Sequence, residues 1–146
     1  MPPIAMPEAV VALTGASGSS YAVRLIEALN DHGWSVNLIV TSSGAINLDL
    51  ECGITPEDLA AREGVVLEDN NNLAARAASG SAKFDAYVVC PASGTTIGKI
   101  AAGISDNLAT RSALVAMKER RKLILVPRES PYSTPHLKAM ANLSEW

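Results

Sequence analysis

The chain has 146 residues, enough for one domain with a sizeable core. Hydrophobic residues make up 48% of the sequence and charged residues 18%, which excludes an intrinsically disordered chain. The net charge of -3 offers no basic surface to a nucleic-acid backbone, so nucleic acid is excluded as a partner. No apolar run approaches the roughly 18 residues that a membrane span requires.

The start of the chain lacks the basic and apolar regions of a signal peptide. Two cysteines, Cys52 and Cys90, are too few for a disulfide framework, and we expect reduced thiols in a cytoplasmic protein. The two histidines and two cysteines are not closely spaced, so no metal site is predicted.

The first half of the chain alternates apolar runs with helical patterns. Residues 10–13 and 36–40 predict buried strands, because their apolar runs are continuous and rich in β-branched residues. Between them, an apolar stripe predicts a helix over residues 20–32. A further helix is expected to start at Thr55-Pro56, where Asp58 completes a capping box. The segment 64–80 gives no clear pattern.

The second half continues the alternation. Residues 86–90 and 123–126 predict two more buried strands, and helices are expected at residues 107–121 and from Thr134-Pro135 toward the end of the chain. Either Ser105 or Asp106 can cap the helix at 107. Strands that alternate with helices predict a single α/β domain with three layers and a doubly wound parallel sheet.

The turn after the first strand, Gly15-Ala16-Ser17-Gly18-Ser19-Ser20, lies where doubly wound sheets bind ligands. It is not a dinucleotide fingerprint, because Ser17 takes the place of the second glycine, and no P-loop Gly-Lys-Ser/Thr follows. Its free N–H groups and hydroxyls suit an anion or a polar ring edge. A tight strand-to-helix connection without a ligand explains the same residues.

Two further turns resemble the first in composition. Thr41-Ser42-Ser43-Gly44 follows the second strand, and Cys90-Pro91-Ala92-Ser93-Gly94-Thr95-Thr96 follows the third predicted strand and opens a helix. Because the carboxyl ends of parallel strands meet at one edge of the sheet, these turns can converge on one ligand. A mononucleotide with a phosphate and a polar ring fits them.

Charged residues gather at two later places. Arg111 and Lys118 are seven residues apart and share one helical face, although a solvated face explains each of them alone. Arg128 and Glu129 follow the last predicted strand, where a functional site and a structural ion pair are both consistent with their position.

Four motifs, TGASG at 14–18, PASGTT at 91–96, SDNLATR at 105–111 and VPRESP at 126–131, resemble those of the flavin prenyltransferases, in order and with natural spacing. That family is part of a wider flavoprotein family that includes cysteine decarboxylases. The resemblance implies a flavodoxin-like sheet that binds FMN at a subunit interface of a dodecamer, without a metal. It also implies that reduced FMN is a substrate, joined at a ring nitrogen and a neighbouring carbon to the dimethylallyl group of dimethylallyl phosphate. The prenylated FMN then serves a partner decarboxylase that acts on aromatic acids.

The resemblance assigns roles to residues by motif. Those implied to contact FMN are Gly15, Ala16, Ser17, Ser42, Ser93, Gly94, Thr95, Thr96 and Arg128. Those implied to handle the prenyl phosphate are Arg111, Lys118, Arg128 and Glu129. The catalytic set comprises Ser17 and Glu129, which can relay or pass a proton, and Glu51, which matches a family glutamate near the reacting centre. An ordinary surface carboxylate explains Glu51 equally well.

The chain departs from the family pattern in places. Ala92 stands where many relatives carry Cys, and Thr95 where some carry Lys. The sequence stops at Trp146, where relatives continue into a strand and a helix that supply a tyrosine and a basic residue to the prenyl phosphate. We therefore expect the flavoprotein domain 1–146 to bind FMN but to prenylate it poorly or not at all.

Two alternatives remain open. A cysteine decarboxylase of the wider family needs a catalytic histidine on the helix after the second strand, and residues 43–50 contain none. His32 precedes the second strand, and His136 lies in the last predicted helix. A non-catalytic FMN-binding subunit is the other alternative.

Overall fold

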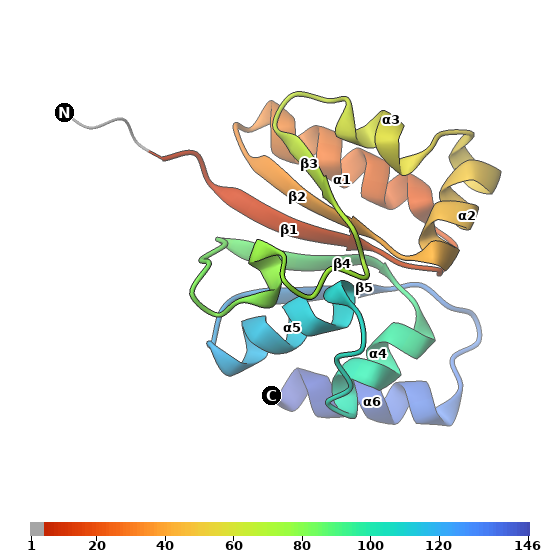
Figure 1. The fold of residues 1–146 in the computed structure, drawn as a ribbon. Helices are drawn as coiled ribbons and strands as arrows, with labels where there is room; N and C mark the ends of the chain where they lie inside the picture. The colour runs from red at the N-terminus through yellow and green to blue at the C-terminus, as the bar shows by residue number, and fades with distance from the viewer. Residues whose placement is uncertain (1–4) are drawn as a thin grey trace.

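A computed structural model describes residues 5–146 and contains five parallel strands in the order β3-β2-β1-β4-β5 (Figure 1). The strands are β1 (Glu8–Leu13), β2 (Ser35–Val40), β3 (Val65–Glu68), β4 (Ala86–Ala92) and β5 (Leu123–Pro127). The chain starts in the middle of the sheet and winds outward in both directions. The predicted doubly wound parallel sheet is thereby confirmed.

Helices cover both faces of this sheet (Figure 1). One face carries α1 (Ser19–Asp31), α2 (Ser42–Cys52) and α3 (Pro56–Ala60), and the other carries α4 (Gly94–Ala101), α5 (Leu108–Lys118), α6 (Thr134–Glu145) and the 3-10 helix η1 (Arg76–Ala78). Alternate residues of β1 supply the two cores: Val11 packs toward α1, and Val10 toward α5.

Two details of the sequence prediction were wrong. The helix predicted over 107–121 is α5, which ends at Lys118, because Arg120 adopts a left-handed φ of 56°. Its cap is Asn107, rather than Ser105 or Asp106: the Asn107 side chain accepts the Thr110 N–H at 2.9 Å. The third strand, β3, lies within the segment that gave no clear pattern.

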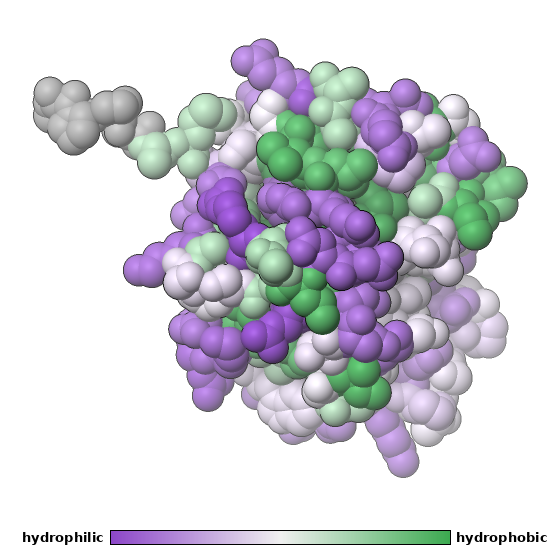
Figure 2. Space-filling view, viewed as in Figure 1, coloured by the Kyte–Doolittle hydropathy of each residue, from purple (hydrophilic) through white to green (hydrophobic). Residues whose placement is uncertain are grey.

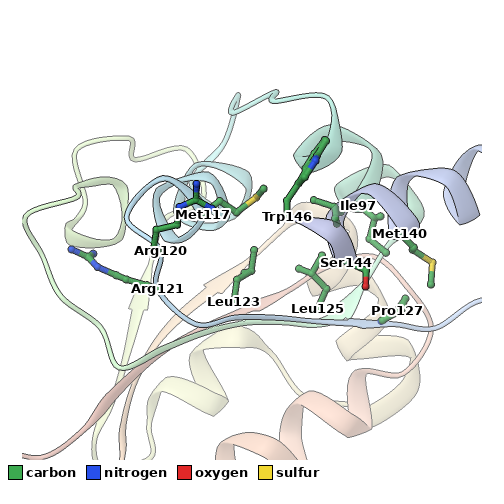
Figure 3. A pocket seen from close by; sticks show the side chains of 11 residues that line it. Ile97, Met117, Arg120, Arg121, Leu123, Leu125, Pro127, Met140, Ser144 and Trp146 are labelled. Atoms are coloured by element: carbon green, nitrogen blue, oxygen red, sulfur yellow. The ribbon is translucent and has the colours of Figure 1, made fainter.

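An apolar groove of about 460 Å³ runs beside β5, the strand at one edge of the sheet (Figure 3). Side chains of β5, α4, α5 and α6 line it, among them Ile97, Met117, Leu123, Leu125 and Met140. None of the residues predicted to contact FMN lies in this groove. Within residues 5–146, no helix is long and apolar enough to cross a bilayer.

Candidate functional site

A polar cleft of about 460 Å³ lies at the carboxyl edge of the sheet, where the loops after β1, β2, β3 and β4 meet. It is lined by hydroxyls, amides and one ion pair, contributed by Gly15, Thr41, Ser42, Ser43, Asn70, Asn71, Ser93, Thr95, Thr96, Lys99, Asp106 and Asn107. The structure therefore brings together the three turns that the sequence singled out.

Thr14 ties the first turn to the turn after β4. Its buried hydroxyl donates to the carbonyl of Pro91 and accepts the backbone N–H of Ser93 at 2.8 Å. The Thr14 N–H also donates to the Pro91 carbonyl at 3.3 Å. These bonds join two strand ends through one side chain, so the floor of the cleft is held in shape by the protein itself.

The turn after β4 ends at Ser93, the cap of α4. The Ser93 hydroxyl oxygen accepts the Thr96 N–H at 3.1 Å and donates to the Thr96 hydroxyl at 2.8 Å. The N–H groups of Gly94 and Thr95, in the first turn of α4, have no partner within an α-helix. With the helix dipole, they favour a negatively charged group at this wall of the cleft.

The turn after β2 is organised in the same way. The Thr41 hydroxyl caps α2 by accepting the Gly44 N–H at 3.0 Å, which leaves Ser42 and Ser43 exposed on the cleft wall. Asn47, one turn further along α2, donates from its side-chain amide to the Gly15 carbonyl at 2.9 Å. A side-chain hydrogen bond thus also links the first two turns.

Glu51 lies at the end of α2 and fills the N-terminus of α1. Its carboxylate accepts the backbone N–H groups of Gly18 at 3.0 Å and Ser19 at 2.8 Å. Gly18 has a φ of 122°, which favours glycine. The hydrogen bond from Gly18, followed by that from Ser19, lowers the pKa of Glu51 below its ordinary value of 4.5, so the carboxylate is ionised at neutral pH.

The other residues predicted in the first turn divide between the interior and solvent. Ala16 is buried, and Ser17 is exposed beside Glu51, where it contributes to the lowered pKa of that carboxyl group. Neither lines the cleft, whereas Gly15 does. Gly94 does not line the cleft either, and it packs under the ring of His136.

Several cleft residues were missed by sequence reasoning. Asn70 follows β3 and fixes the start of α5, because its carbonyl accepts the Leu108 N–H at 2.8 Å and its side chain accepts the Ala109 N–H at 3.0 Å. Lys99 and Asp106 form an ion pair with an N–O distance of 3.0 Å. The spacing of Asn107 and Thr110 is a capping signal that was available in the sequence.

The four residues implied to handle the prenyl phosphate lie on α5 and in the segment after β5. The Arg111 Nε donates to the Ala78 carbonyl at 3.2 Å, and Lys118, at the far end of α5, contacts Glu119 at 2.6 Å. Arg128 and Glu129 are exposed just after β5, at the carboxyl edge of the sheet. Within one chain, Lys118 lies at the opposite edge, because α5 runs antiparallel to the strands.

The cleft fits a flavin mononucleotide in size and chemistry. Its volume falls within the roughly 300–1,000 Å³ of small-molecule sites. The free N–H groups of α4 and the hydroxyls of Ser42 and Thr95 suit a phosphate, and the amide groups of Asn70 and Asn71 can meet polar edges of the ligand.

Sequence comparison identifies relatives over nearly the whole chain. The flavoprotein family profile matches residues 5–144. A flavin prenyltransferase UbiX from Thermoplasma acidophilum is 46% identical over 136 residues, which cover 93% of this chain and 74% of that protein. The flavin prenyltransferase LpdB from Lactiplantibacillus plantarum is 41% identical over 141 residues, 96% of this chain and 75% of that protein.

Solved structures give the same result. A crystal structure of AnUbiX in complex with FMN and dimethylallyl pyrophosphate superposes with a TM-score of 0.91 at 32% identity, covering 97% of this chain and 74% of that one. A dodecameric FMN-dependent UbiX-like decarboxylase from Escherichia coli O157:H7 gives 0.90 at 36% identity, covering 94% and 75%. The chain therefore belongs to the flavoprotein family and, within it, to the flavin prenyltransferases.

Proposed function

We propose that this protein is a flavin prenyltransferase that transfers a dimethylallyl group from dimethylallyl phosphate to reduced FMN. The observation that supports it most directly is the polar cleft formed by three hydroxyl-rich turns, in a chain 46% identical to a curated flavin prenyltransferase. The bound FMN is the substrate, and its reduced ring supplies the electron-rich atoms that accept the prenyl carbon.

The residues of the chain supply positioning, charge and proton transfer. The turns that contain Gly15, Ser42 and Ser93 hold the ligand through hydroxyls and backbone N–H groups. As the allylic C–O bond breaks, the guanidinium groups of Arg111 and Arg128 stabilise the negative charge on the departing phosphate. No nucleophile from the protein is required.

The two candidate carboxylates differ in their surroundings. Glu129 is exposed after β5, where it is free to accept or donate a proton as general acid–base. Glu51 is held ionised by the N–H groups of Gly18 and Ser19, so at neutral pH it acts as an acceptor and not as an acid. Ser17, beside it, can pass a proton to or from this carboxylate.

A second copy of the chain completes the phosphate site in this proposal. Lys118 ends α5 at the amino edge of the sheet, whereas Arg128 and Glu129 follow β5 at the carboxyl edge, so one chain does not gather all four. Ile46 and Leu50 of α2 are exposed, and Figure 2 shows apolar surface over this helix, which a neighbouring copy can cover. We expect a cytoplasmic homo-oligomer, a dodecamer like the Escherichia coli protein, that passes prenylated FMN to an aromatic-acid decarboxylase. Light scattering of the purified protein tests the assembly.

Product analysis tests the reaction. The purified protein is incubated without oxygen with reduced FMN and dimethylallyl phosphate, and the released flavin is examined by mass spectrometry. A flavin heavier by one dimethylallyl group supports the proposal. Release of unmodified FMN alone, from a version extended by a relative's C-terminal segment that binds FMN tightly, would instead favour the non-catalytic FMN-binding subunit.

No observation favours the cysteine decarboxylase alternative. α2, the helix after the second strand, contains no histidine. His32 is exposed at the end of α1, and His136 packs on Gly94. Likeness to the peptidyl-cysteine decarboxylase EpiD, with a TM-score of 0.69 at 19% identity, concerns the fold alone.

A further inference from the structure

The cleft contains a cation that no motif assigned. Among the described residues that line it, Lys99 is the only Lys or Arg. It lies on α4, one helical turn beyond Thr95, and its Nζ is 3.2 Å and 3.0 Å from the two carboxylate oxygens of Asp106. Arg111, Lys118 and Arg128, the cations implied by the family motifs, do not line this cleft.

The Lys99–Asp106 pair is loosely held. The side chains are 31% and 55% exposed, and an ion pair with that much solvent contact contributes little to stability. Asp106 does not cap α5, because Asn107 does. The fold therefore does not depend on the pair, and the Lys99 ammonium can be taken over by a stronger partner.

A phosphate monoester is such a partner. It carries about 1.5 to 2 negative charges at pH 7 and has three acceptor oxygens, whereas a carboxylate carries one charge. The Lys99 ammonium has three donors, so it can reach a phosphate and still keep a contact with Asp106. The N-terminus of α4 and the hydroxyl of Thr95 point to the same wall of the cleft and add donors for the same anion.

We propose that Lys99 binds the phosphate of the flavin nucleotide and makes the cleft select FMN over riboflavin, while Asp106 holds the ammonium in place until the phosphate arrives. The inference rests on the proposed function, since it names the residue that recognises one end of that substrate. It assigns Lys99 a role in substrate specificity, not in the prenyl-transfer step.

The two members of the pair have opposite effects under this proposal. Loss of Lys99 removes the positive charge that faces the phosphate. Loss of the Asp106 charge frees the ammonium and removes an anion that repels the phosphate. A pair with only a structural role would behave differently, because either substitution breaks the same contact and both should then act in the same direction.

The experiment compares the affinities of FMN and riboflavin by quenching of flavin fluorescence, in buffer of low ionic strength. The variants are Lys99→Met and Asp106→Asn, with Lys83→Met, an exposed lysine before β4, as the matched control. For Lys99→Met, we expect the Kd for FMN to rise about tenfold and that for riboflavin to stay unchanged. For Asp106→Asn, the Kd for FMN should fall severalfold, and Lys83→Met should leave both values unchanged.

Three results would overturn the inference. One is an unchanged ratio of FMN to riboflavin affinity in Lys99→Met, and another is weaker FMN binding in both pocket variants. The third is a wild-type protein that binds the two flavins equally well. Thermal unfolding checks that each variant is folded. If Lys99→Met is not folded, the direction in which Asp106→Asn changes the FMN affinity decides the outcome alone. A wild-type protein that binds neither flavin would contradict the proposed function itself.

Discussion

The ring of His136 lies directly over Gly94. A Cβ atom built on Gly94 would be 2.1 Å from Cε1 of His136 and 2.5 Å from each ring nitrogen, closer than real Cβ contacts come. Gly94 begins α4 and His136 belongs to the first turn of α6, so this contact fixes the helix N-terminus that forms one wall of the cleft. The glycine of the PASGTT motif is required here for the close approach of a side chain.

This contact predicts strong coupling between the two positions. Gly→Ala in a helix normally stabilises by roughly 0.5–1 kcal/mol, but Gly94→Ala should destabilise by about 1–3 kcal/mol because the ring must move. His136→Ala should remove most of that cost. Urea unfolding of the two single variants and the double variant measures the coupling. Strictly additive effects would show that the ring adapts without strain.

The charge of Glu51 predicts a pH-dependent contribution to stability. A carboxylate whose pKa is lowered by folding stabilises the native state above its ordinary pKa of 4.5, and this contribution is lost as pH falls through the lowered value. Glu51→Gln should therefore cost about 0.3–1 kcal/mol at pH 7 and progressively less below pH 4.5. Denaturant unfolding at several pH values measures this, with Glu63→Gln as the exposed control. A cost that is independent of pH would mean that the charge plays no part.

Ser42 allows a test of anion binding that does not disturb the fold. It is exposed on the cleft wall at the first position of α2, where an acidic residue suits the helix dipole. Ser42→Asp should leave the free energy of unfolding unchanged or slightly higher, yet weaken FMN binding about tenfold or more through charge repulsion. Ser81→Asp, in an exposed loop away from the cleft, is the control. Equal FMN affinity in Ser42→Asp and wild type would place the phosphate elsewhere.

Glu129 is predicted to take part in proton transfer. In a chain extended by a relative's C-terminal segment, its replacement by Gln should slow single-turnover prenylation of reduced FMN by about 10²-fold or more, with little effect on FMN affinity. His32→Ala, which removes an exposed side chain at the end of α1, should have no effect. A Glu129→Gln rate equal to that of wild type rules the role out.

The apolar groove beside β5 predicts the effect of a segment fused to the end of the chain. Ile124 of this edge strand is 44% exposed, and the groove offers an apolar surface to a further segment. Fusion of a curated relative's C-terminal segment to Trp146 should leave FMN affinity unchanged and raise the rate of prenylation about 10²-fold or more. A Gly/Ser extension of equal length is the control. Equal activity of the 146-residue chain and the fusion would contradict this.

The sequence predicted the elements whose signals are local. Continuous apolar runs marked β1, β2, β4 and β5, which are buried or half-buried along most of their length. β3 was missed because it has four residues at a sheet edge, and Val66 within it is 57% exposed. Its pattern is therefore neither a buried run nor a regular alternation.

The residues of the cleft, too, could be predicted only where their sequence signals are local. Turns rich in Gly, Ser and Thr carry a local signal, so Gly15, Ser42 and Ser93 could be named in advance. Asn70 lines the cleft only because it follows β3 in the fold. Asp106 lines it because of the path that the chain takes between α4 and α5. Lys99 had a weak signal, since it follows Thr95 by four residues and so shares its helical face.

The bonds of Thr14 to Pro91 and Ser93, and of Asn47 to Gly15, have a kinetic consequence. Turns that are already fixed to one another do not have to order around an arriving ligand, so little conformational entropy is lost on binding. The cleft then behaves as a rigid receptor, and association is limited by encounter and not by loop closure. In stopped-flow experiments, substitutions on the cleft wall should alter the residence time of FMN far more than its rate of arrival.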